Sequence, residues 1–407
     1  MKKENQHYDI VIVGAGLVGL IMALSLASKK IKVTIIERNN LSREQTKKID
    51  KRTTALSQGT KRYLKSLNLW DEIKLLVQPI KKIEVSDNSM IKNLLFDSTD
   101  LNEGDLGFII ENELFKKILI NKVIKSTFIK LLDKENVVDI KFEKLYSKNK
   151  VRISLDSRVI TSNLIIGADG RYSRIKHYAN IKSFSHTYKQ NAYVFILEHK
   201  KNHQGVAVER FFPEGPLAIL PMKKKNKNIS RSSIVWTIDE KLGDFSKLSN
   251  EDFKTEFAMR YKNYFGSIVS ISRPLMYPLN LSFAYENYKN CLVLVGDSSQ
   301  AIHPIAGQGF NLGVRDCFNL SEALDSSIKL GIELGDKNTL SDYSNKRSLD
   351  KTIFIGSTHI LNYLFSNNNS FVKFFRTTGL GILEKLPKMK KQLMYLAMGL
   401  RKLNLNG

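Results

Sequence analysis

The sequence predicts an α/β protein in which a Rossmann-like dinucleotide-binding domain is interrupted by an antiparallel β-sheet and followed by C-terminal helices. Three observations predict this fold. A βαβ pattern with a glycine-rich turn opens the chain. Short β-rich segments separated by turn residues fill the region from about Phe184 to Trp236, and a helical pattern extends from Thr339 onward. A chain of 407 residues also exceeds one ordinary domain.

The opening unit begins with Asp9–Val13, a short apolar strand rich in β-branched residues. A helix is expected over Leu17–Ser28 and a second strand over Ile31–Ile36. Two lysines precede an apolar run that ends at Ala27, a pattern that also suits a signal peptide or a membrane span. Because glycines in the run have a better explanation, we expect a cytoplasmic protein, soluble or peripheral on the inner membrane face.

That explanation is a nucleotide-binding turn. Gly14, Gly16 and Gly19 follow the first strand at GxGxxG spacing, and Glu37 with Arg38 ends the second strand. Glycines let the backbone turn sharply and approach a pyrophosphate, the helix N-terminus supplies N–H groups, and the acid accepts hydrogen bonds from ribose hydroxyls. The motif predicts a dinucleotide site without separating FAD from NAD.

The remaining elements alternate between helical and strand patterns. A helix is expected over Leu114–Lys130, and a later one over Gly309–Leu324. Strands are expected at Val137–Phe142, Val151–Leu155, Leu164–Ile166, Ala192–Leu197, Gly205–Phe211, Leu217–Leu220, Ser232–Ile238 and Cys291–Val295. We therefore assign residues 1–80, 100–180 and 275–335 to the dinucleotide-binding domain. Residues 81–99 and 181–274 are assigned to the inserted sheet, and 336–407 to a C-terminal helical region.

Composition excludes some function classes. The net charge is +24, but lysine predominates and is spread along the chain, so we expect no nucleic-acid partner. Weak attraction to anionic membrane surfaces fits better. Cys291 and Cys317 lack CxxC spacing, so neither a disulfide framework nor a metal site is expected, and both are predicted to be small core residues.

Two later motifs carry a family resemblance. Gly167-Ala168-Asp169-Gly170 follows a buried strand, and Gly296-Asp297 precedes His303-Pro304 and the run Gly307-Gln308-Gly309-Phe310-Asn311-Leu312-Gly313. With the first turn, they resemble the flavin-dependent aromatic hydroxylases of the para-hydroxybenzoate hydroxylase type. The resemblance implies FAD as cofactor, with Asp297 at its ribityl chain. It also implies Asp169 and Gly170 near the pyrophosphate and Arg52 near the flavin.

The resemblance narrows to the hydroxylases of ubiquinone biosynthesis. It rests on residues 303–313 with Arg315-Asp316, on Arg52–Leu56, Leu106-Gly107 and Glu111-Asn112, and on Glu209–Phe211, Gly215–Ala218 and Leu220-Pro221. It implies hydroxylation of a polyprenylated phenol through a flavin C4a-hydroperoxide, with O2 and an NAD(P)H donor. Two departures occur. Ser298-Ser299-Gln300 stands where many relatives have Ala-Ala-His, and Lys176 stands where many have Arg, which puts the pyridine-nucleotide contact in doubt.

Some roles stay open at this point. A helix beginning near Gly307 would direct N–H groups at the pyrimidine end of the flavin and favour its anionic reduced form, so Gln308, Gly309, Phe310 and Asn311 are assigned to the cofactor site. His303 is either a base or a residue that shapes the flavin pocket. Pro304 is expected to line the same pocket.

Alternative functions also remain. One is a hydroxylase of a small aromatic acid, with an arginine for the carboxylate, or a flavin enzyme acting on another isoprenoid. A different class is a non-catalytic FAD-binding subunit of a biosynthetic complex. The last helix, with Leu386, Met389, Leu393, Leu396, Leu400 and Leu403 among lysines, suits either a membrane or partner surface or packing on the protein's own core.

Overall fold

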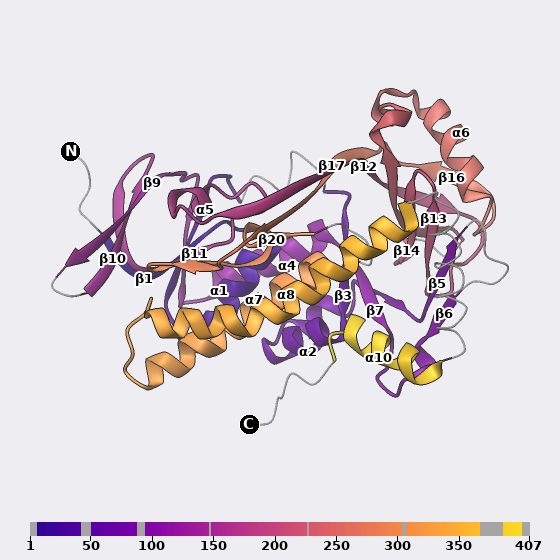
Figure 1. The fold of residues 1–407 in the computed structure, drawn as a ribbon. Coiled ribbons are helices and arrows are strands. Elements are labelled where there is room, and N and C mark those ends of the chain that lie inside the picture. Colours follow the sequence, from indigo (N-terminus) through magenta and orange to yellow (C-terminus); the bar gives the residue numbers. More distant parts are fainter. Residues whose placement is uncertain are drawn as a thin grey trace. The chain divides into compact units, whose positions relative to one another are not determined.

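The computed structural model describes residues 6–41, 50–87, 94–145, 148–225, 228–302, 307–366 and 386–400. It divides into two compact units. Unit 1 consists of residues 1–49, 114–186 and 280–356, and unit 2 of residues 50–113, 187–279 and 357–407. Figure 1 labels the helices and strands of both.

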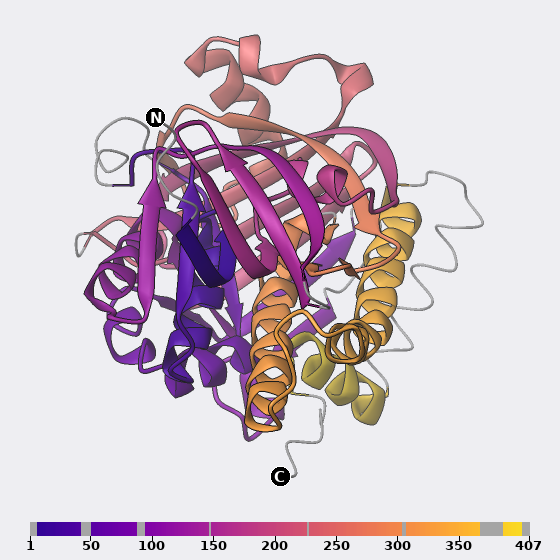
Figure 2. The same cartoon turned by 90° about the vertical axis from the view of Figure 1, so that its left-hand side faces the viewer.

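Unit 1 is built on a sheet of eight strands within the described ranges. Its main path is β18-β19-β11-β1-β2-β8, in which β19, β11, β1, β2 and β8 run parallel. The antiparallel hairpin β9–β10 extends from β11 and lies at the front of Figure 2. The strands are β1 (Gln6–Val13), β2 (Val33–Glu37), β8 (Ile129–Asp133), β9 (Val137–Leu145), β10 (Lys148–Leu155), β11 (Val159–Gly167), β18 (Tyr288–Lys289) and β19 (Leu292–Leu294). Buried, mainly apolar runs occur in β1, β2, β11 and β19, as expected for parallel strands covered on both faces.

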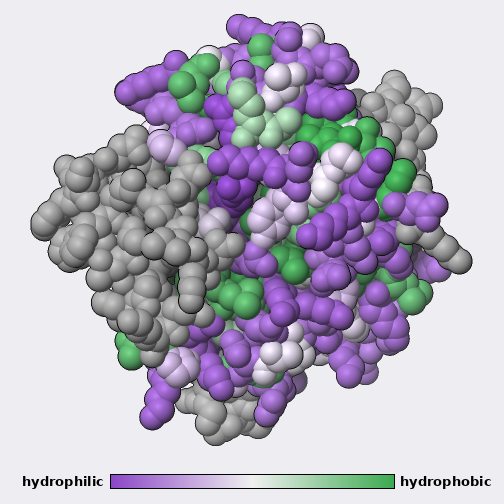
Figure 3. Space-filling model, turned by 90° about the vertical axis from the view of Figure 1, so that its right-hand side faces the viewer, coloured by the Kyte–Doolittle hydropathy of each residue, from purple (hydrophilic) through white to green (hydrophobic). Residues whose placement is uncertain are grey.

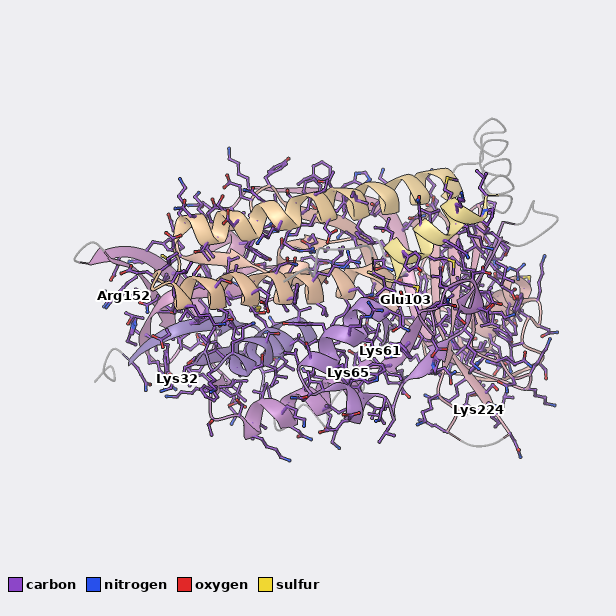
Figure 4. All side chains as sticks on the ribbon, turned by 90° about the horizontal axis from the view of Figure 1, so that it is seen from below. Lys32, Lys61, Lys65, Glu103, Arg152 and Lys224 are labelled. Atoms are coloured by element: carbon purple, nitrogen blue, oxygen red, sulfur yellow. The ribbon has the colours of Figure 1, made fainter. Side chains whose placement is uncertain are left out.

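The helices of unit 1 pack around this sheet. They are α1 (Leu17–Ser28), α4 (Asn112–Lys125), α5 (Arg174–Tyr178), α7 (Gln308–Lys329) and the part of α8 (Lys337–Ser366) that ends at residue 356. Figures 1 and 4 show α7 and α8 running side by side. The prediction for α1 is confirmed. The helix predicted to reach Lys130 ends at Lys125, because Ile129 begins β8 and pairs with Val33 of β2.

A second sheet has nine strands in the described part of the chain, in the order β20-β17-β12-β15-β14-β13-β5-β6, with β16 beside β12. Its strands are β5 (Lys82–Asp87), β6 (Leu94–Asp97), β12 (Ser183–His199), β13 (Val206–Phe212), β14 (Gly215–Met222), β15 (Ser230–Asp239), β16 (Ile268–Ile271), β17 (Leu275–Ala284) and β20 (Gln300–Ala301). The four strands predicted between residues 192 and 238 are confirmed. The sheet is not wholly antiparallel, because β13 pairs in parallel with β5, a strand from a distant part of the chain.

An aromatic core supports this sheet in unit 2. Helix α6 (Asn250–Tyr261) inserts Phe253 and Phe257 against Phe195 and Trp236, all fully or almost fully buried. The short helices η3 (Glu240–Leu242) and η4 (Phe245–Lys247) precede α6. Among the residues coloured in Figure 3, hydrophilic ones predominate on this face, with apolar residues in groups between them. The inserted sheet thus has a core of its own.

Three further strands complete unit 2. They are β3 (Thr53–Ser57), β4 (Gln78–Ile80) and β7 (Gly107–Glu111), in the order β3-β7-β4, with α2 (Gln58–Ser66), α3 (Trp70–Ile73) and η2 (Ser98–Asp100) beside them in sequence. Ile80 and Ile109 pack with Ala207 and Met222 of the large sheet. This packing is why residues 50–80 and 100–113 lie in unit 2, whereas the sequence assigned them to the dinucleotide-binding domain.

The C-terminal region also divides differently from the prediction. Residues 337–356 of α8 belong to unit 1, and α10 (Pro387–Ala397) belongs to unit 2. Met394 and Met398 pack with Ile80 and Ile109, so α10 does pack on a core. Of the predicted apolar stripe, Leu400 packs against this core, whereas Leu386, Met389 and Leu393 are exposed; Leu403 lies outside the described residues.

Two smaller predictions can be compared with the structure. Cys291 and Cys317 are both buried and free, which confirms them as core residues. Basic side chains occur on many separate elements, among them Lys32 and Arg152 of unit 1 and Lys61, Lys65 and Lys224 of unit 2 (Figure 4). No helix among the described residues is long and apolar enough to cross a membrane.

Candidate functional site

The three nucleotide-binding motifs begin at neighbouring strand ends in unit 1. Val13 of β1 pairs with Gly167 of β11, and Gly167 pairs with Leu294 of β19, all in parallel register. The residues that follow these strand ends are the glycine turn, Asp169-Gly170 and Gly296-Asp297. Open α/β sheets bind ligands at the carboxyl ends of their strands. The fold therefore brings together three motifs that begin at Gly14, Gly167 and Gly296, far apart in sequence.

Close packing requires glycine at two positions of the first turn. A Cβ on Gly14, whose φ is +108°, would lie 2.5 Å from the carbonyl oxygen of Ala168. A Cβ on Gly19 would lie only 2.0 Å from the carbonyl oxygen of Gly14. Gly16 differs, because it is exposed and a Cβ there would have no atom within 4 Å. Gly14 and Gly19 thus serve the fold, whereas Gly16 leaves open space at the N-terminus of α1.

The acidic residue after β2 contacts the same turn. One Glu37 carboxylate oxygen accepts a hydrogen bond from the backbone N–H of Ala15 at 2.7 Å, and the other accepts from Asn39 N–H at 3.0 Å. Glu37 is half-buried and Arg38 is exposed. The predicted pairing of glycine turn and acid is therefore present in the fold, with the carboxylate beside the turn that would carry a nucleotide.

Asp169 has a structural task that the motif did not indicate. Its Oδ2 accepts hydrogen bonds from the backbone N–H groups of Arg174 at 2.8 Å and Ile175 at 3.1 Å, at the start of α5. Its Oδ1 is buried, and no residue in the described part of the chain donates to it. Burial raises the pKa of Asp169, against the hydrogen bonds that it accepts, and burial lowers the pKa of Lys176, against the attraction of Asp169.

The third motif forms the short helix η5 (Gly296–Ser298). Gly296 has φ +63°, and a Cβ there would lie 3.0 Å from Val18 of α1; a Cβ on Gly313 of α7 would lie 2.8 Å from the same side chain. The glycines therefore let η5 and α7 approach the first turn of α1. The Asp297 side chain is exposed, while its neighbours Gly296 and Ser298 are buried. The turn therefore exposes Asp297 between two buried residues.

Helix α7 begins where the glycine-rich run predicts it. Gly307 is its N-cap in the left-handed region at φ 59° and, as a glycine, has no side chain to cap the helix. Phe310 packs edge-to-face on the buried Phe115 at 5.8 Å between ring centroids, and Asn311 Nδ2 donates to the Gly307 carbonyl at 3.2 Å. A helix N-terminus carries a partial positive charge, so this end suits a partly anionic group.

These features fit FAD. A Cβ on Gly16, or on Gly170 at φ +85°, would meet no atom within 4 Å, so the backbone is open to a ligand at both positions. The N-cap residues of α1 and α7 are glycines, which have no side chain to cap the helix. The buried Asp169 Oδ1 has unused capacity to accept a hydrogen bond or a proton. An elongated dinucleotide would use these groups. His303 and Pro304 lie outside the described residues.

Arg52 belongs to unit 2. Its guanidinium donates to both carboxylate oxygens of Asp50, each at 2.8 Å, and lies 5.5 Å from the ring centroid of Tyr277. Half of its side chain is exposed. Arg52 thus has an ion-pair partner, and its predicted position near a flavin stays a prediction.

Sequence reasoning missed several buried charges. Asp316 was noted only within a motif, and Arg347 and Lys351 of α8 belong to no motif, yet all three are buried beneath η5 in unit 1. In unit 2, Glu209 was likewise noted only within a motif; it is half-buried, and burial raises its pKa to about 7. Within the described residues this carboxylate has no hydrogen-bond or ion-pair partner, and alternation along β13 places it on the face opposite Val208 and the aromatic core. Only tertiary burial could reveal these residues.

Comparisons with known proteins show the family to which the chain belongs. A family model described as an FAD binding domain matches residues 7–351. Ubiquinone hydroxylase UbiL of Rhodospirillum rubrum is 32% identical over 97% of this chain and 90% of its own. The mitochondrial ubiquinone biosynthesis monooxygenase COQ6 of Homo sapiens is 27% identical over 96% and 92%.

Solved structures with the same fold include p-nitrophenol 4-monooxygenase PnpA from Pseudomonas putida. It has a TM-score of 0.79 and 17% identity and covers 98% of this chain and 100% of its own. PqsL of Pseudomonas aeruginosa, titled a probable FAD-dependent monooxygenase, has a TM-score of 0.75 and 18% identity over 92% and 99%. The predicted para-hydroxybenzoate hydroxylase-like fold is confirmed. The protein belongs to the FAD-binding family of flavoprotein monooxygenases and is an FAD-dependent aromatic-ring hydroxylase.

Proposed function

We propose that this enzyme hydroxylates the aromatic ring of a polyprenylated phenol in ubiquinone biosynthesis, with O2 as co-substrate and NAD(P)H as electron donor. The observation that carries the proposal is the meeting of three FAD motifs at one sheet edge in a chain whose full-length relatives include ubiquinone hydroxylases. Bound FAD would supply the electrons that allow one oxygen atom of O2 to enter the ring and the other to leave as water.

The chain's own residues would hold the cofactor along the edge of the unit 1 sheet. The first turn of α1, opened by Gly16, would bind the pyrophosphate, and Glu37 with Arg38 would meet the adenosine ribose. Asp297 would accept hydrogen bonds from the ribityl hydroxyls. The α7 N-terminus, from Gly307 through Asn311, would stabilise negative charge on the isoalloxazine ring.

Other assignments follow from the resemblance alone and are part of the proposal. Asp169 and Gly170 would lie near the pyrophosphate, and Arg52 near the flavin ring. His303 would act as a base or shape the pocket, and Pro304 would line it.

We also propose peripheral attachment to an anionic membrane through α10, because Leu386, Met389 and Leu393 are exposed between exposed lysines such as Lys388 and Lys391.

Genetic complementation tests the substrate class. The gene is expressed in bacterial strains that each lack one ubiquinone hydroxylase, and quinones and their precursors are identified by mass spectrometry. We expect one strain to recover ubiquinone, and the precursor that disappears identifies the ring carbon. If the flavin-loaded protein restores ubiquinone in none of them, the substrate assignment is wrong.

Assays of the purified holoenzyme separate the alternative functions. Donor oxidation is followed with a prenylphenol, with a small hydroxybenzoate and with neither. The proposal expects stimulation and a hydroxylated product with the prenylphenol only. A preference for the hydroxybenzoate would support the soluble-acid alternative, and no donor oxidation with any phenol would support a non-catalytic subunit.

Sedimentation of the protein with vesicles that contain anionic lipid tests the proposed membrane attachment, with neutral vesicles as the control.

A further inference from the structure

A buried polar network lies beneath the turn that carries Asp297. Gly296 N–H donates to Asp316 Oδ2 at 2.9 Å, and Gln300 Nε2 donates to the same oxygen at 3.1 Å. Ser298 Oγ donates to the carbonyl of Gly167 at 2.5 Å. The backbone on both sides of Asp297 is therefore attached to the protein interior, although the Asp297 side chain itself is exposed.

Asp316 is in turn fixed by α8. Its Oδ1 accepts from Arg347 Nε at 2.7 Å, and the two side chains are 0% and 1% exposed. Arg347 also donates to Asp350 at 2.5 Å and to the carbonyl of Leu312 at 3.3 Å. Asp316, which contacts the turn, is thus oriented by Arg347, and Arg347 is oriented by Asp350 and the Leu312 carbonyl. Removing one member of such a pair leaves an uncompensated charge in the interior.

Lys351, one turn further along α8, supports the other side of the turn. Its Nζ donates to Ser299 Oγ and to Asn287 Oδ1, both at 2.5 Å, and Ser299 Oγ donates to Asn287 Oδ1 at 2.6 Å. Lys351 is 7% exposed, and burial lowers its pKa to about 8. No carboxylate among the described residues lies within ion-pairing distance of its ammonium group. Burying a cation whose hydrogen bonds go only to neutral groups costs free energy. The hydrogen bonds of the Lys351 side chain to described residues join it to Ser299, beside the Asp297 turn, and to Asn287.

We infer that Arg347 and Lys351 are positioning residues for the cofactor, which hold η5 so that the Asp297 carboxylate stands where the flavin's ribityl chain binds. The inference rests on the proposed role of Asp297 in FAD binding. Among the described residues, no hydrogen bond or ion pair joins either side chain to a residue assigned to the cofactor site. Their effect on FAD must therefore pass through the turn, whereas a merely structural role would change stability without coupling to Asp297.

A double-mutant cycle tests the inference on the full-length apoprotein. FAD affinity is measured by flavin fluorescence for wild type, Lys351→Met, Asp297→Ala and the double variant, and thermal unfolding of each apoprotein is recorded. We expect Lys351→Met to weaken FAD binding about tenfold in the wild-type background, within the range found for residues of one hydrogen-bonded network. In the Asp297→Ala background the same substitution should change FAD affinity less than twofold. The bound flavin's absorption spectrum should shift in Lys351→Met.

The controls separate the possible failures. Lys29→Met removes a lysine of unit 1 that pairs with Glu322 and Asp325 away from the turn, and it should leave FAD affinity unchanged. If Lys351→Met does not fold, Lys351→Gln, which keeps an N–H donor, and Arg347→Lys take its place in the same cycle. Additive effects in both backgrounds would overturn the inference. If Asp297→Ala alone leaves FAD affinity unchanged, it is the proposed cofactor role of Asp297 that fails.

Discussion

Alanine substitutions at two glycines of the first turn should both weaken FAD binding, but only one of them should destabilise the fold. In Gly19→Ala the new Cβ would lie 2.0 Å from the Gly14 carbonyl oxygen, whereas ordinary contact begins at 3.4 Å. The α1 backbone must therefore move by roughly 1 Å, and such overpacking costs about 1–3 kcal/mol or more. We expect the apoprotein to unfold at a lower temperature and to bind FAD poorly.

Gly16→Ala meets no such obstacle. Gly16 has φ −69° and ψ 175°, which any residue adopts, and its Cβ has no neighbour within 4 Å. The free energy of unfolding of the apoprotein should change by no more than about 0.5 kcal/mol. The methyl group would occupy the proposed pyrophosphate space and displace a charge-assisted hydrogen bond worth about 1.5–3 kcal/mol. FAD affinity should therefore fall about ten- to hundredfold.

Fluorescence titration with FAD and thermal unfolding of the apoproteins check both variants. Gly356→Ala is the matched control, because its Cβ also has no neighbour within 4 Å but it lies on α8 away from the strand ends. Wild-type FAD affinity in Gly16→Ala would refute the assignment of that space to the pyrophosphate. Wild-type stability in Gly19→Ala would refute the packing argument.

Three further outcomes are expected. Glu209 holds its proton in the folded state up to its pKa of about 7, whereas the unfolded chain loses it near 4.5, so stability falls as pH rises through this window. Glu209→Gln should remove about 2 kcal/mol of the decline between pH 5 and pH 8 in urea unfolding, and an unchanged pH slope would contradict this. Burial lowers the pKa of His199 to about 4. Between pH 6.5 and pH 4 this histidine is therefore protonated in the unfolded chain but neutral in the folded protein, which favours unfolding as the pH falls. The His199 contribution to stability should therefore fall by about 2 kcal/mol from pH 7 to pH 5, and the difference in stability between wild type and His199→Gln should change by that amount over this range. Phe257→Ala, in the aromatic core of unit 2, should cost about 3–5 kcal/mol, measured by urea unfolding, and a cost below 1 kcal/mol would show that the core collapses around the cavity.

The sequence was sufficient wherever a local rule applied. Gly14, Gly16 and Gly19 with the β-branched run before them predicted β1, α1 and the adjacent acid, and period-two alternation predicted the strands of the large sheet between residues 192 and 238. Short-range sterics and hydrogen bonding determine these features, and both can be inferred from neighbouring residues.

Tertiary structure decided what depends on distant partners. The parallel pairing of β13 with β5 and the inclusion of residues 50–113 in unit 2 follow from side chains that meet across more than 100 positions of sequence. The same holds for Arg347 and Lys351, which look like ordinary helix-surface residues in sequence but are buried against the Asp297 turn. Burial changes the cost of a charge, and a residue's burial depends on which segments fold around it.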